Sequence, residues 1–335
     1  MQTRILPGPG APSLTAAVEC AAEWLERGQV VGLPTETVYG LGGDALNPEA
    51  AARIFEAKER PFFDPLICHL PSEAWLERLT QVPAGACRVV DALREAFWPG
   101  PLTLVLPRRA VVPDLVSSGL PTVAVRRSAH PLFSAVLDRF GRPVAAPSAN
   151  RFGRISPTCA LHVERELGGR IPMVLDGGPT EHGLESTIVA VDGQGRMRIL
   201  RSGPVTREQL EDLGEVLAAD AANVVGAERP EAPGQLASHY APRTPMELVA
   251  EGAPICVEGE PVQRVGLLAW REARPGFAVT ERLSESGDLR EAAATLFAKM
   301  RALDESGVDR IVAEAVPSVG LGVAINDRLR RASAR

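Results

Sequence analysis

Residues 30–70 constrain the fold of this chain more than any other part of the sequence. An apolar run predicts a buried strand at Val30–Leu33. The glycines at residues 40–43 predict a tight backbone turn, and apolar spacing predicts a helix over residues 48–57. A second apolar run, Leu66–Leu70, predicts another strand. This order is typical of α/β proteins, in which ligands bind at the ends of strands.

Strands and helices continue to alternate up to residue 217, and several strands are close enough in sequence to pair antiparallel. The pattern predicts a first domain at residues 1–217 built on a twisted, mixed α/β sheet. Residues 218–245 are rich in Ala, Gly, Pro and polar side chains and predict a linker, although Ser238–Pro242 (SHYAP) is unusual for a passive tether. Residues 246–335 predict a second, small α/β domain. Predicted strands lie at 102–106, 121–126, 144–146, 173–175, 186–191, 199–201, 264–270 and 310–314, and predicted helices at 13–27, 72–79, 84–96, 130–140, 158–167, 288–304 and 322–332.

Composition limits the function. The net charge of −6 and the aromatic content of 4% argue against a platform that stacks single-stranded nucleic acid. Five scattered cysteines predict reduced thiols, and their spacing fits no zinc site. The sequence shows no signal peptide and no apolar run of transmembrane length. We therefore expect a cytoplasmic protein with no membrane partner and no metal held by protein side chains alone.

The chain lacks a Gly-x-Ser-x-Gly elbow and a phosphate-binding Gly-x-x-x-x-Gly-Lys-Ser/Thr loop. It carries instead arginines, one lysine and small polar residues at predicted strand and helix ends. Arginine offers a planar fork to phosphate or carboxylate, and lysine offers a point charge. This set suits a nucleotide beside a small carboxylate, with catalysis by positioning and charge neutralisation. The candidates are Lys58, Arg60, Arg126, Ser148, Asn150, Ser156, Ser186 and Arg201.

Lys58 is one of only two lysines in a chain with 36 Lys and Arg residues. A functional cation is one interpretation, and a solvated helix end that favours the helix dipole is the other. His69 lies in an apolar run, so a buried core histidine is the alternative to a ligand-binding one. Taken singly, each arginine or serine of the set has a structural explanation as well.

Three motifs occur in order: PTETVYGLG at Pro34–Gly42, Lys58-x-Arg60-Pro61, and Ser148-Ala149-Asn150. Together they resemble the threonylcarbamoyl-AMP synthase family, the YrdC-like proteins. The resemblance covers residues 13–207. The remainder is similar to the long form of the family, with an accessory C-terminal domain, and matches best at Gly320–Leu329 (GLGVAINDRL).

The resemblance implies a nucleotidyltransferase that joins L-threonine, bicarbonate and ATP, with Mg²⁺, into threonylcarbamoyl-adenylate and pyrophosphate. The adenylate would supply a tRNA-modifying transferase complex that acts on adenosine 37, and direct tRNA binding stays open. Lys58 and Arg60 are the implied catalytic residues. Threonine contacts carry over to Thr37, His69, Arg126, Ala146 and Ser186. ATP contacts carry over to Arg60, Asp64, Thr122, Ser148, Asn150, Ser156, Arg201 and Tyr240.

Asp64 departs from the family, which often has Asn there, and a carboxylate beside a triphosphate would repel it unless it helps to hold Mg²⁺. Tyr240 would fold over the nucleotide. Lys58→Ala or Arg60→Ala is expected to abolish turnover with little change in melting temperature.

Two other classes stay open at this point: an RNA-binding module, and a carbamoyl- or acyl-phosphate hydrolase or carbamoyltransferase that uses the same fold. The zinc-finger cysteines of the related carbamoyltransferases are missing.

Overall fold

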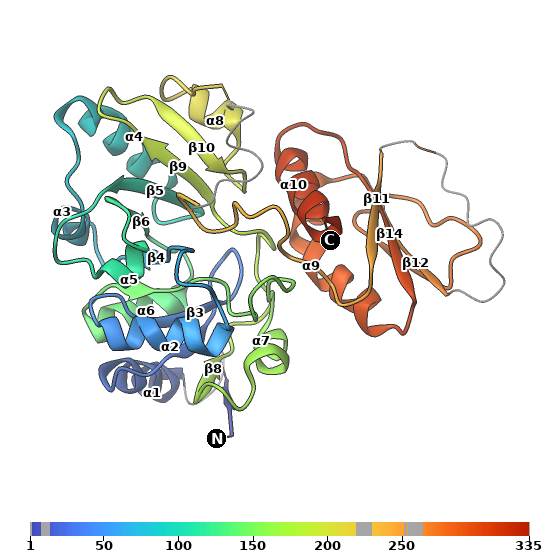
Figure 1. Cartoon of the computed structure of the whole chain (residues 1–335), viewed down its shortest axis with the longest axis horizontal. Coiled ribbons are helices and arrows are strands. Elements are labelled where there is room, and N and C mark those ends of the chain that lie inside the picture. Colours follow the sequence, from blue (N-terminus) through green and yellow to red (C-terminus); the bar gives the residue numbers. More distant parts are fainter. Residues whose placement is uncertain (1, 8–13, 219–229, 251–252, 254–263, 335) are drawn as a thin grey trace.

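The structure is a computed structural model, and it describes residues 2–7, 14–218, 230–250, 253 and 264–334. It contains a larger domain and a smaller one, joined by a linker that crosses from one to the other (Figure 1). The larger domain is built on a ten-stranded sheet and the smaller on a four-stranded sheet. The two-domain α/β architecture and the mixed sheet that the sequence predicted are confirmed.

The larger sheet has the strand order β1-β8-β2-β3-β7-β4-β6-β5-β9-β10. The sheet is mixed, because it contains parallel pairs such as β4 with β6 and antiparallel pairs such as β5 with β6. Its strands are β1 (Arg4–Leu6), β2 (Val31–Leu33), β3 (Gly40–Asp44), β4 (Ile67–His69), β5 (Leu102–Pro107), β6 (Thr122–Arg126), β7 (Val144–Ala145), β8 (Met173–Leu175), β9 (Thr187–Val191) and β10 (Met197–Arg201).

Helices bury the apolar side chains of this sheet in two main cores. Helices α1 and α6 pack together and share one core with β2 and β8. Residues of α2, α4 and α7 belong to a larger second core. The helices are α1 (Leu14–Glu26), α2 (Pro48–Lys58), α3 (Ala74–Leu79), the 3-10 turn η1 (Ala84–Ala86), α4 (Cys87–Phe97), α5 (Asp114–Ser117), α6 (Pro131–Phe140), α7 (Ala160–Leu167) and α8 (Arg207–Glu211).

The predicted glycine turn at residues 40–43 is wrong, because these residues form strand β3, antiparallel to β2. None of the three glycines there has a positive φ. A Cβ on Gly42 would lie 2.7 Å from Leu33 Cδ1 and 2.9 Å from Val144 Cγ1. Glycine is therefore required by close packing between neighbouring strands and not by backbone conformation.

Most other predicted elements are present with shifts of one or two residues. The prediction missed β1, α5, α8 and two strands of the smaller domain, β11 (Met246–Val249) and β13 (Val279–Arg282), and it merged η1 with α4. Part of the predicted linker, residues 219–229, lies outside the described residues. Residues 230–245 contact both domains: the Ala241 amide bonds to the Gly153 carbonyl of the larger domain, and the His239 amide bonds to the Arg331 carbonyl of the smaller one.

The smaller domain has a parallel sheet in the order β11-β14-β12-β13, covered by α9 and α10. The two helices lie between this sheet and the larger domain (Figure 1). The elements are β11 (Met246–Val249), β12 (Val265–Ala269), β13 (Val279–Arg282), α9 (Leu289–Glu305), β14 (Arg310–Glu314) and α10 (Leu321–Ser333). In the described part of the chain, no helix is both long and apolar enough to cross a bilayer.

Candidate functional site

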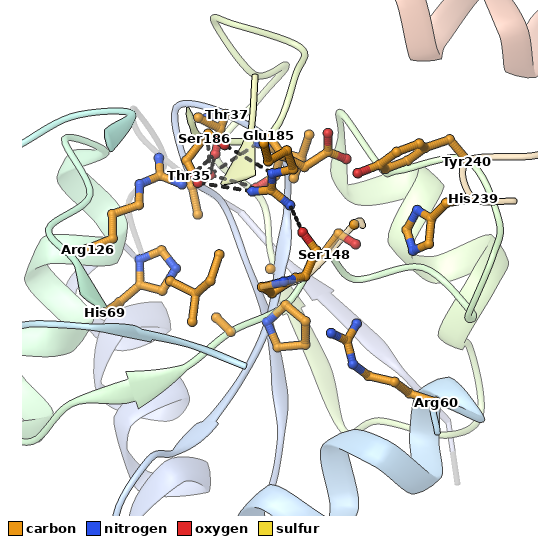
Figure 2. A pocket seen from close by; sticks show the side chains of 18 residues that line it. Thr35, Thr37, Arg60, His69, Arg126, Ser148, Glu185, Ser186, His239 and Tyr240 are labelled. Carbon is orange, nitrogen blue, oxygen red and sulfur yellow. Dashed lines mark hydrogen bonds between the residues drawn. The ribbon is translucent and has the colours of Figure 1, made fainter. Parts of the chain in front are cut away.

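A pocket lies where several strands of the larger sheet end, and the linker covers one side of it (Figure 2). Arg126 and His69 lie at one end of the pocket, and Arg60, His239 and Tyr240 at the other (Figure 2). The free volume is only about 40 Å³. The lining residues are Thr35, Thr37, Val38, Gly40, Arg60, Ile67, His69, Arg126, Ala146, Pro147, Ser148, Glu185, Ser186, Arg201, Pro233, Gly234, His239 and Tyr240.

Arg126, the last residue of β6, is 3% exposed and ion-paired with Glu36 at 2.6 Å. It also donates to Thr37 Oγ1 at 2.9 Å and to the Gly100 carbonyl at 3.1 Å. A guanidinium has five N–H donors, so two remain for a ligand. A buried cation with free donors in a fixed fork is suited to a small carboxylate.

Glu36 holds Arg126 in place and was missed by the sequence analysis, although it lies inside the quoted PTETVYGLG motif. Burial alone would raise its pKa. The Arg126 charge and the hydrogen bonds from Ser128 and Arg126 outweigh burial and lower the pKa to about 2. Glu36 is therefore ionised at neutral pH, and the pair with Arg126 is a buried salt bridge with further hydrogen bonds.

His69 ends β4 and packs against the Phe133 ring at a centroid distance of 4.8 Å. Burial, assisted by the Arg126 charge, lowers its pKa to about 3. The imidazole is therefore neutral at pH 7. Within the described residues its Nδ1 has no hydrogen-bond partner, so this nitrogen is available to a bound hydroxyl or amine.

Ser186 connects the two ends of the pocket. It shares a hydrogen bond of 2.8 Å with Thr103, and Arg201 Nη2 donates to its Oγ at 3.1 Å. Arg201 also donates to the Ser186 and Pro233 carbonyls. No salt bridge joins Arg201 to a carboxylate in the described chain, so its charge is available to an anion.

Arg60 follows the end of α2 and lies at the second end of the pocket. Its Nη2 is 2.9 Å from Asp64 Oδ2, and its hydrogen bonds go to the Asp64 and Pro65 carbonyls. Asp64 itself is fully buried and does not line the pocket. Burial raises the pKa of Asp64, opposed by the charges of Arg60, Lys58 and Arg201. This proximity to cations offsets the repulsion that the sequence suggested between Asp64 and a triphosphate.

Lys58 lies behind the pocket wall and does not line it. The residue is 1% exposed, and its Nζ donates to the Ser148 and Asn150 carbonyls at 2.5 Å each. Burial lowers its pKa well below the ordinary value. Lys58 therefore holds the 148–150 loop. The alternative of a solvated helix end is wrong, because the side chain is buried. The two buried carbonyls that Lys58 bonds lead us to expect that Lys58→Ala lowers stability as well as turnover.

The linker closes the pocket with Tyr240. This residue has a φ of 64° and is 1% exposed, and its ring stacks on Phe297 of α9 at 5.6 Å. Its hydroxyl, although buried, has no hydrogen-bond partner among the described residues. Next to it, His239 packs edge-on against the Tyr240 ring. The side chain predicted to cover a nucleotide thus lies against the pocket.

The structure brings nine of the predicted site residues into this pocket: Thr37, Arg60, His69, Arg126, Ala146, Ser148, Ser186, Arg201 and Tyr240. Five others do not line it: Lys58, Asp64, Thr122, Asn150 and Ser156. Thr122 begins β6, whereas Arg126 ends it, so the two are about 13 Å apart along the strand. Asn150 bonds to the Arg151 and Arg154 carbonyls, and Ser156 to Glu185.

Glu185 is a second carboxylate that the sequence analysis missed, and no motif singled it out. It lines the pocket and accepts hydrogen bonds from Ser156 and, across the domain boundary, from Arg328. Glu185 is also ion-paired with Arg328, whose charge would compete with a metal ion for the carboxylate. Within the described residues, no group of three or more His, Cys, Asp or Glu side chains could hold a metal ion.

Comparison with known proteins accounts for both domains. Residues 23–203 match the family model described as "Telomere recombination", and residues 205–334 match the one described as "Threonylcarbamoyl-AMP synthase, C-terminal domain". The threonylcarbamoyl-AMP synthase of Bacillus subtilis is 40% identical over 323 residues, which cover 93% of this chain and 92% of the relative. That of Pyrococcus abyssi is 40% identical over 329 residues, 94% of each chain.

A solved structure agrees with these sequence matches. The crystal structure of P. abyssi Sua5 complexed with L-threonine superposes with a TM-score of 0.88 at 36% identity, covering 99% of this chain and 98% of that one. Both domains and their relative placement are therefore shared with a threonine-binding relative. The chain belongs to the threonylcarbamoyl-AMP synthase family.

Proposed function

We propose that the pocket binds L-threonine at its Arg126 end and ATP at its Arg60 end, and that the chain uses both with bicarbonate. The products are threonylcarbamoyl-adenylate and pyrophosphate. The observation that carries this proposal is one pocket with a buried arginine at each end. Residues 1–217 would form the catalytic domain, residues 218–245 the linker and residues 246–335 the accessory domain.

The Arg126 end suits a small amino acid. Two free N–H groups of Arg126 would bind the threonine carboxylate, while Glu36 fixes the plane of the guanidinium. Neutral His69 with its unpaired Nδ1, and the hydroxyls of Thr37 and Ser186, would bind the rest of the ligand. These groups match the carboxylate, amine and hydroxyl of a small amino acid, so we assign this end to the smaller substrate.

The opposite end suits phosphates. Arg60 and Arg201 lie at or near the pocket surface with donors to spare, and the Ser148 side chain adds a hydroxyl. A free volume of about 40 Å³ is far below the several hundred Å³ that a nucleotide-sized ligand needs. The linker side chains Pro233, Gly234, His239 and Tyr240 occupy this side. ATP entry would therefore require the linker to shift outward and then close over the nucleotide.

The reaction needs no protein nucleophile. Threonine nitrogen bonds to the bicarbonate carbon with loss of water, and a carbamate oxygen then attacks the α-phosphorus of ATP. The bond from the α-phosphorus to the bridging oxygen breaks, and pyrophosphate leaves with that electron pair. Arg60 and Arg201 would neutralise the charge that develops on the phosphates. Lys58 would act as a positioning residue through the 148–150 loop, because its amine bonds only to backbone carbonyls.

Mg²⁺ is the metal expected for such a reaction. The described residues do not fit a metal site made by the protein alone, because they contain no group of three or more His, Cys, Asp or Glu side chains that could hold an ion, and Glu185 and Asp64 are each paired with an arginine. Mg²⁺ commonly binds through substrate phosphates and few protein ligands. It would therefore arrive on the triphosphate, and the roles given above to protein side chains do not depend on it.

The product would pass to a tRNA-modifying transferase in the cytoplasm. A net charge of −6 gives no broad basic field for tRNA, so we propose that the adenylate, and not the tRNA, is the ligand handled here. Cys20, Cys68, Cys87 and Cys159 are free thiols in the structure, as suits a reducing compartment.

The test is product formation measured by mass spectrometry and pyrophosphate release, with each of threonine, bicarbonate and ATP omitted in turn. The proposal expects threonylcarbamoyl-adenylate only in the complete mixture. Serine in place of threonine is the matched substrate control. Pyrophosphate release that ignores threonine, or no product from the complete mixture, would contradict the proposal.

A further inference from the structure

An arginine of the accessory domain lies directly behind the wall of the pocket, where it contacts the lining residue Glu185. Arg328 lies on α10, is fully buried, and is among the largest fully buried side chains of the described chain. Its Nε donates to Glu185 Oε2 at 2.8 Å, and its Nη2 donates to the Ser202 carbonyl at 2.9 Å. A single side chain from the other domain thus holds two segments of the catalytic domain: the one that precedes β9 in the sequence and the one that follows β10.

Glu185 transmits this contact to the pocket. Its other oxygen accepts from Ser156, and the next residue, Ser186, accepts from Arg201. Residues 185–187 also lie close to the segment after β10, because a Cβ on Gly203 would be only 2.5 Å from the Glu185 carbonyl oxygen. Arg328, Glu185, Ser186 and Arg201 therefore form one continuous set of contacts from the accessory domain to the nucleotide end of the pocket.

Arg328 also reaches the linker. Its guanidinium carbon lies 5.1 Å from the centre of the Tyr240 ring, a cation–π distance. Phe297 of α9 stacks on the same ring. The accessory domain thus supplies the surface on which Tyr240 packs.

The geometry of these contacts requires arginine. One planar fork bonds Glu185, the Ser202 carbonyl and Asp327 and still faces an aromatic ring. Lysine has a single nitrogen and cannot satisfy these partners together, although it keeps the positive charge beside Glu185. Replacing Arg328 by Lys therefore separates the fork geometry from the charge.

We propose that Arg328 is a positioning residue that makes the accessory domain part of the ATP site. It fixes the positions of the Glu185 and Tyr240 side chains. Through these two residues it also fixes the position of Arg201 and the closed position of the linker. This inference rests on the proposed placement of ATP at this end of the pocket. Arg328 contacts neither Arg126 nor His69 and reaches the threonine end only through Glu185 and its neighbour Ser186, so threonine binding should depend on it far less than ATP binding does.

The experiment compares Arg328→Lys with Arg330→Lys in the full-length chain. Arg330 lies on the same helix, is exposed, and makes one hydrogen bond to the Asn326 carbonyl, so it controls for a general change on α10. Arg328→Lys should raise the KM for ATP at least tenfold, while the Kd for threonine measured by calorimetry changes less than twofold. Arg330→Lys should leave both constants unchanged.

Hydrogen exchange gives a second readout. The Ala241 amide bonds to the Gly153 carbonyl, and the His239 amide bonds to the Arg331 carbonyl. Both amides should exchange faster in Arg328→Lys, whereas amides in β4 and β6 should not change. A merely structural loss would raise exchange in all of these segments together.

The inference is overturned if Arg328→Lys has the wild-type KM for ATP, or if threonine and ATP binding weaken equally. If the wild-type chain forms no threonylcarbamoyl-adenylate, the proposed function fails instead, and the two results are distinct. Should Arg328→Lys not fold, the pair Glu185→Gln with Arg328→Gln removes both buried charges and serves for the same assays. On the wild-type chain, a non-hydrolysable ATP analogue should alter exchange in α10, and an unchanged α10 counts against the inference.

Discussion

Replacing Glu36 by Gln should remove a pH-dependent part of the stability of the catalytic domain. The pKa of Glu36 is lowered from 4.5 to about 2. Burial raises the pKa, but the Arg126 charge and the hydrogen bonds from Ser128 and Arg126 lower it by more. Each pKa unit corresponds to about 1.4 kcal/mol, so the difference contributes about 3 kcal/mol. Since the folded pKa is depressed, this contribution is fully present above pH 4.5 and is lost as the pH falls toward 2.

The assay is urea unfolding followed by tryptophan fluorescence at pH 7, 5, 4 and 3. At pH 7 the Glu36→Gln chain should be about 3 kcal/mol less stable than wild type, and by pH 3 about 2 kcal/mol of that difference should be gone. Glu23→Gln is the control, because its side chain is 51% exposed and its pair with Arg27 lies on the surface. A wild-type-to-mutant difference that stays constant from pH 7 to pH 3 would refute the reasoning.

The remaining predictions concern other parts of the pocket wall. Lys58→Met should lower the free energy of unfolding by about 2–4 kcal/mol and reduce the melting temperature, because two buried carbonyls lose their hydrogen-bond donor. An unchanged melting temperature would count against the role of Lys58 in holding the 148–150 loop. Gly42→Ala should cost about 1–3 kcal/mol through overpacking, whereas Gly193→Ala, with no atom near its Cβ, should be neutral in the same denaturation assay. The threonine Kd measured by calorimetry should stay constant from pH 5.5 to 8, because the His69 pKa is about 3; a titration near pH 6.5 would show that His69 ionises. Tyr240→Phe should keep the melting temperature, since the hydroxyl has no bonded partner within the described residues; a clear loss of stability would reveal one.

Local patterns in the sequence predicted most of the fold. Apolar periodicity placed α2 and β14 within one residue of their observed bounds, because both elements bury a regular set of side chains. The same reasoning mistook β3 for a turn. Glycine is used there because Leu33 and Val144 crowd the strand, and neither neighbour is apparent from the glycines themselves.

The site was predictable where a residue ends a strand and faces the pocket, as Arg126 and Arg201 do. It was not predictable where the role depends on a distant partner. Glu36 pairs with a residue 90 positions away, and Glu185 with one 143 positions away. Lys58 shows the same limit, because its rarity in the sequence indicated a special role but not that its partners are the carbonyls of residues 148 and 150.

The central claim is that one pocket binds threonine at one end and ATP at the other, each through its own arginine. Arg126→Lys and Arg60→Lys keep a positive charge beside Glu36 and Asp64 respectively, so both chains should fold. The most direct measurement is calorimetry of both variants with threonine and with a non-hydrolysable ATP analogue. Arg126→Lys should weaken threonine binding at least tenfold and leave the affinity for the ATP analogue unchanged. Arg60→Lys should weaken binding of the analogue at least tenfold and leave the affinity for threonine unchanged. The claim would be contradicted if both variants lost affinity equally for both ligands, or if neither variant lost affinity for either ligand.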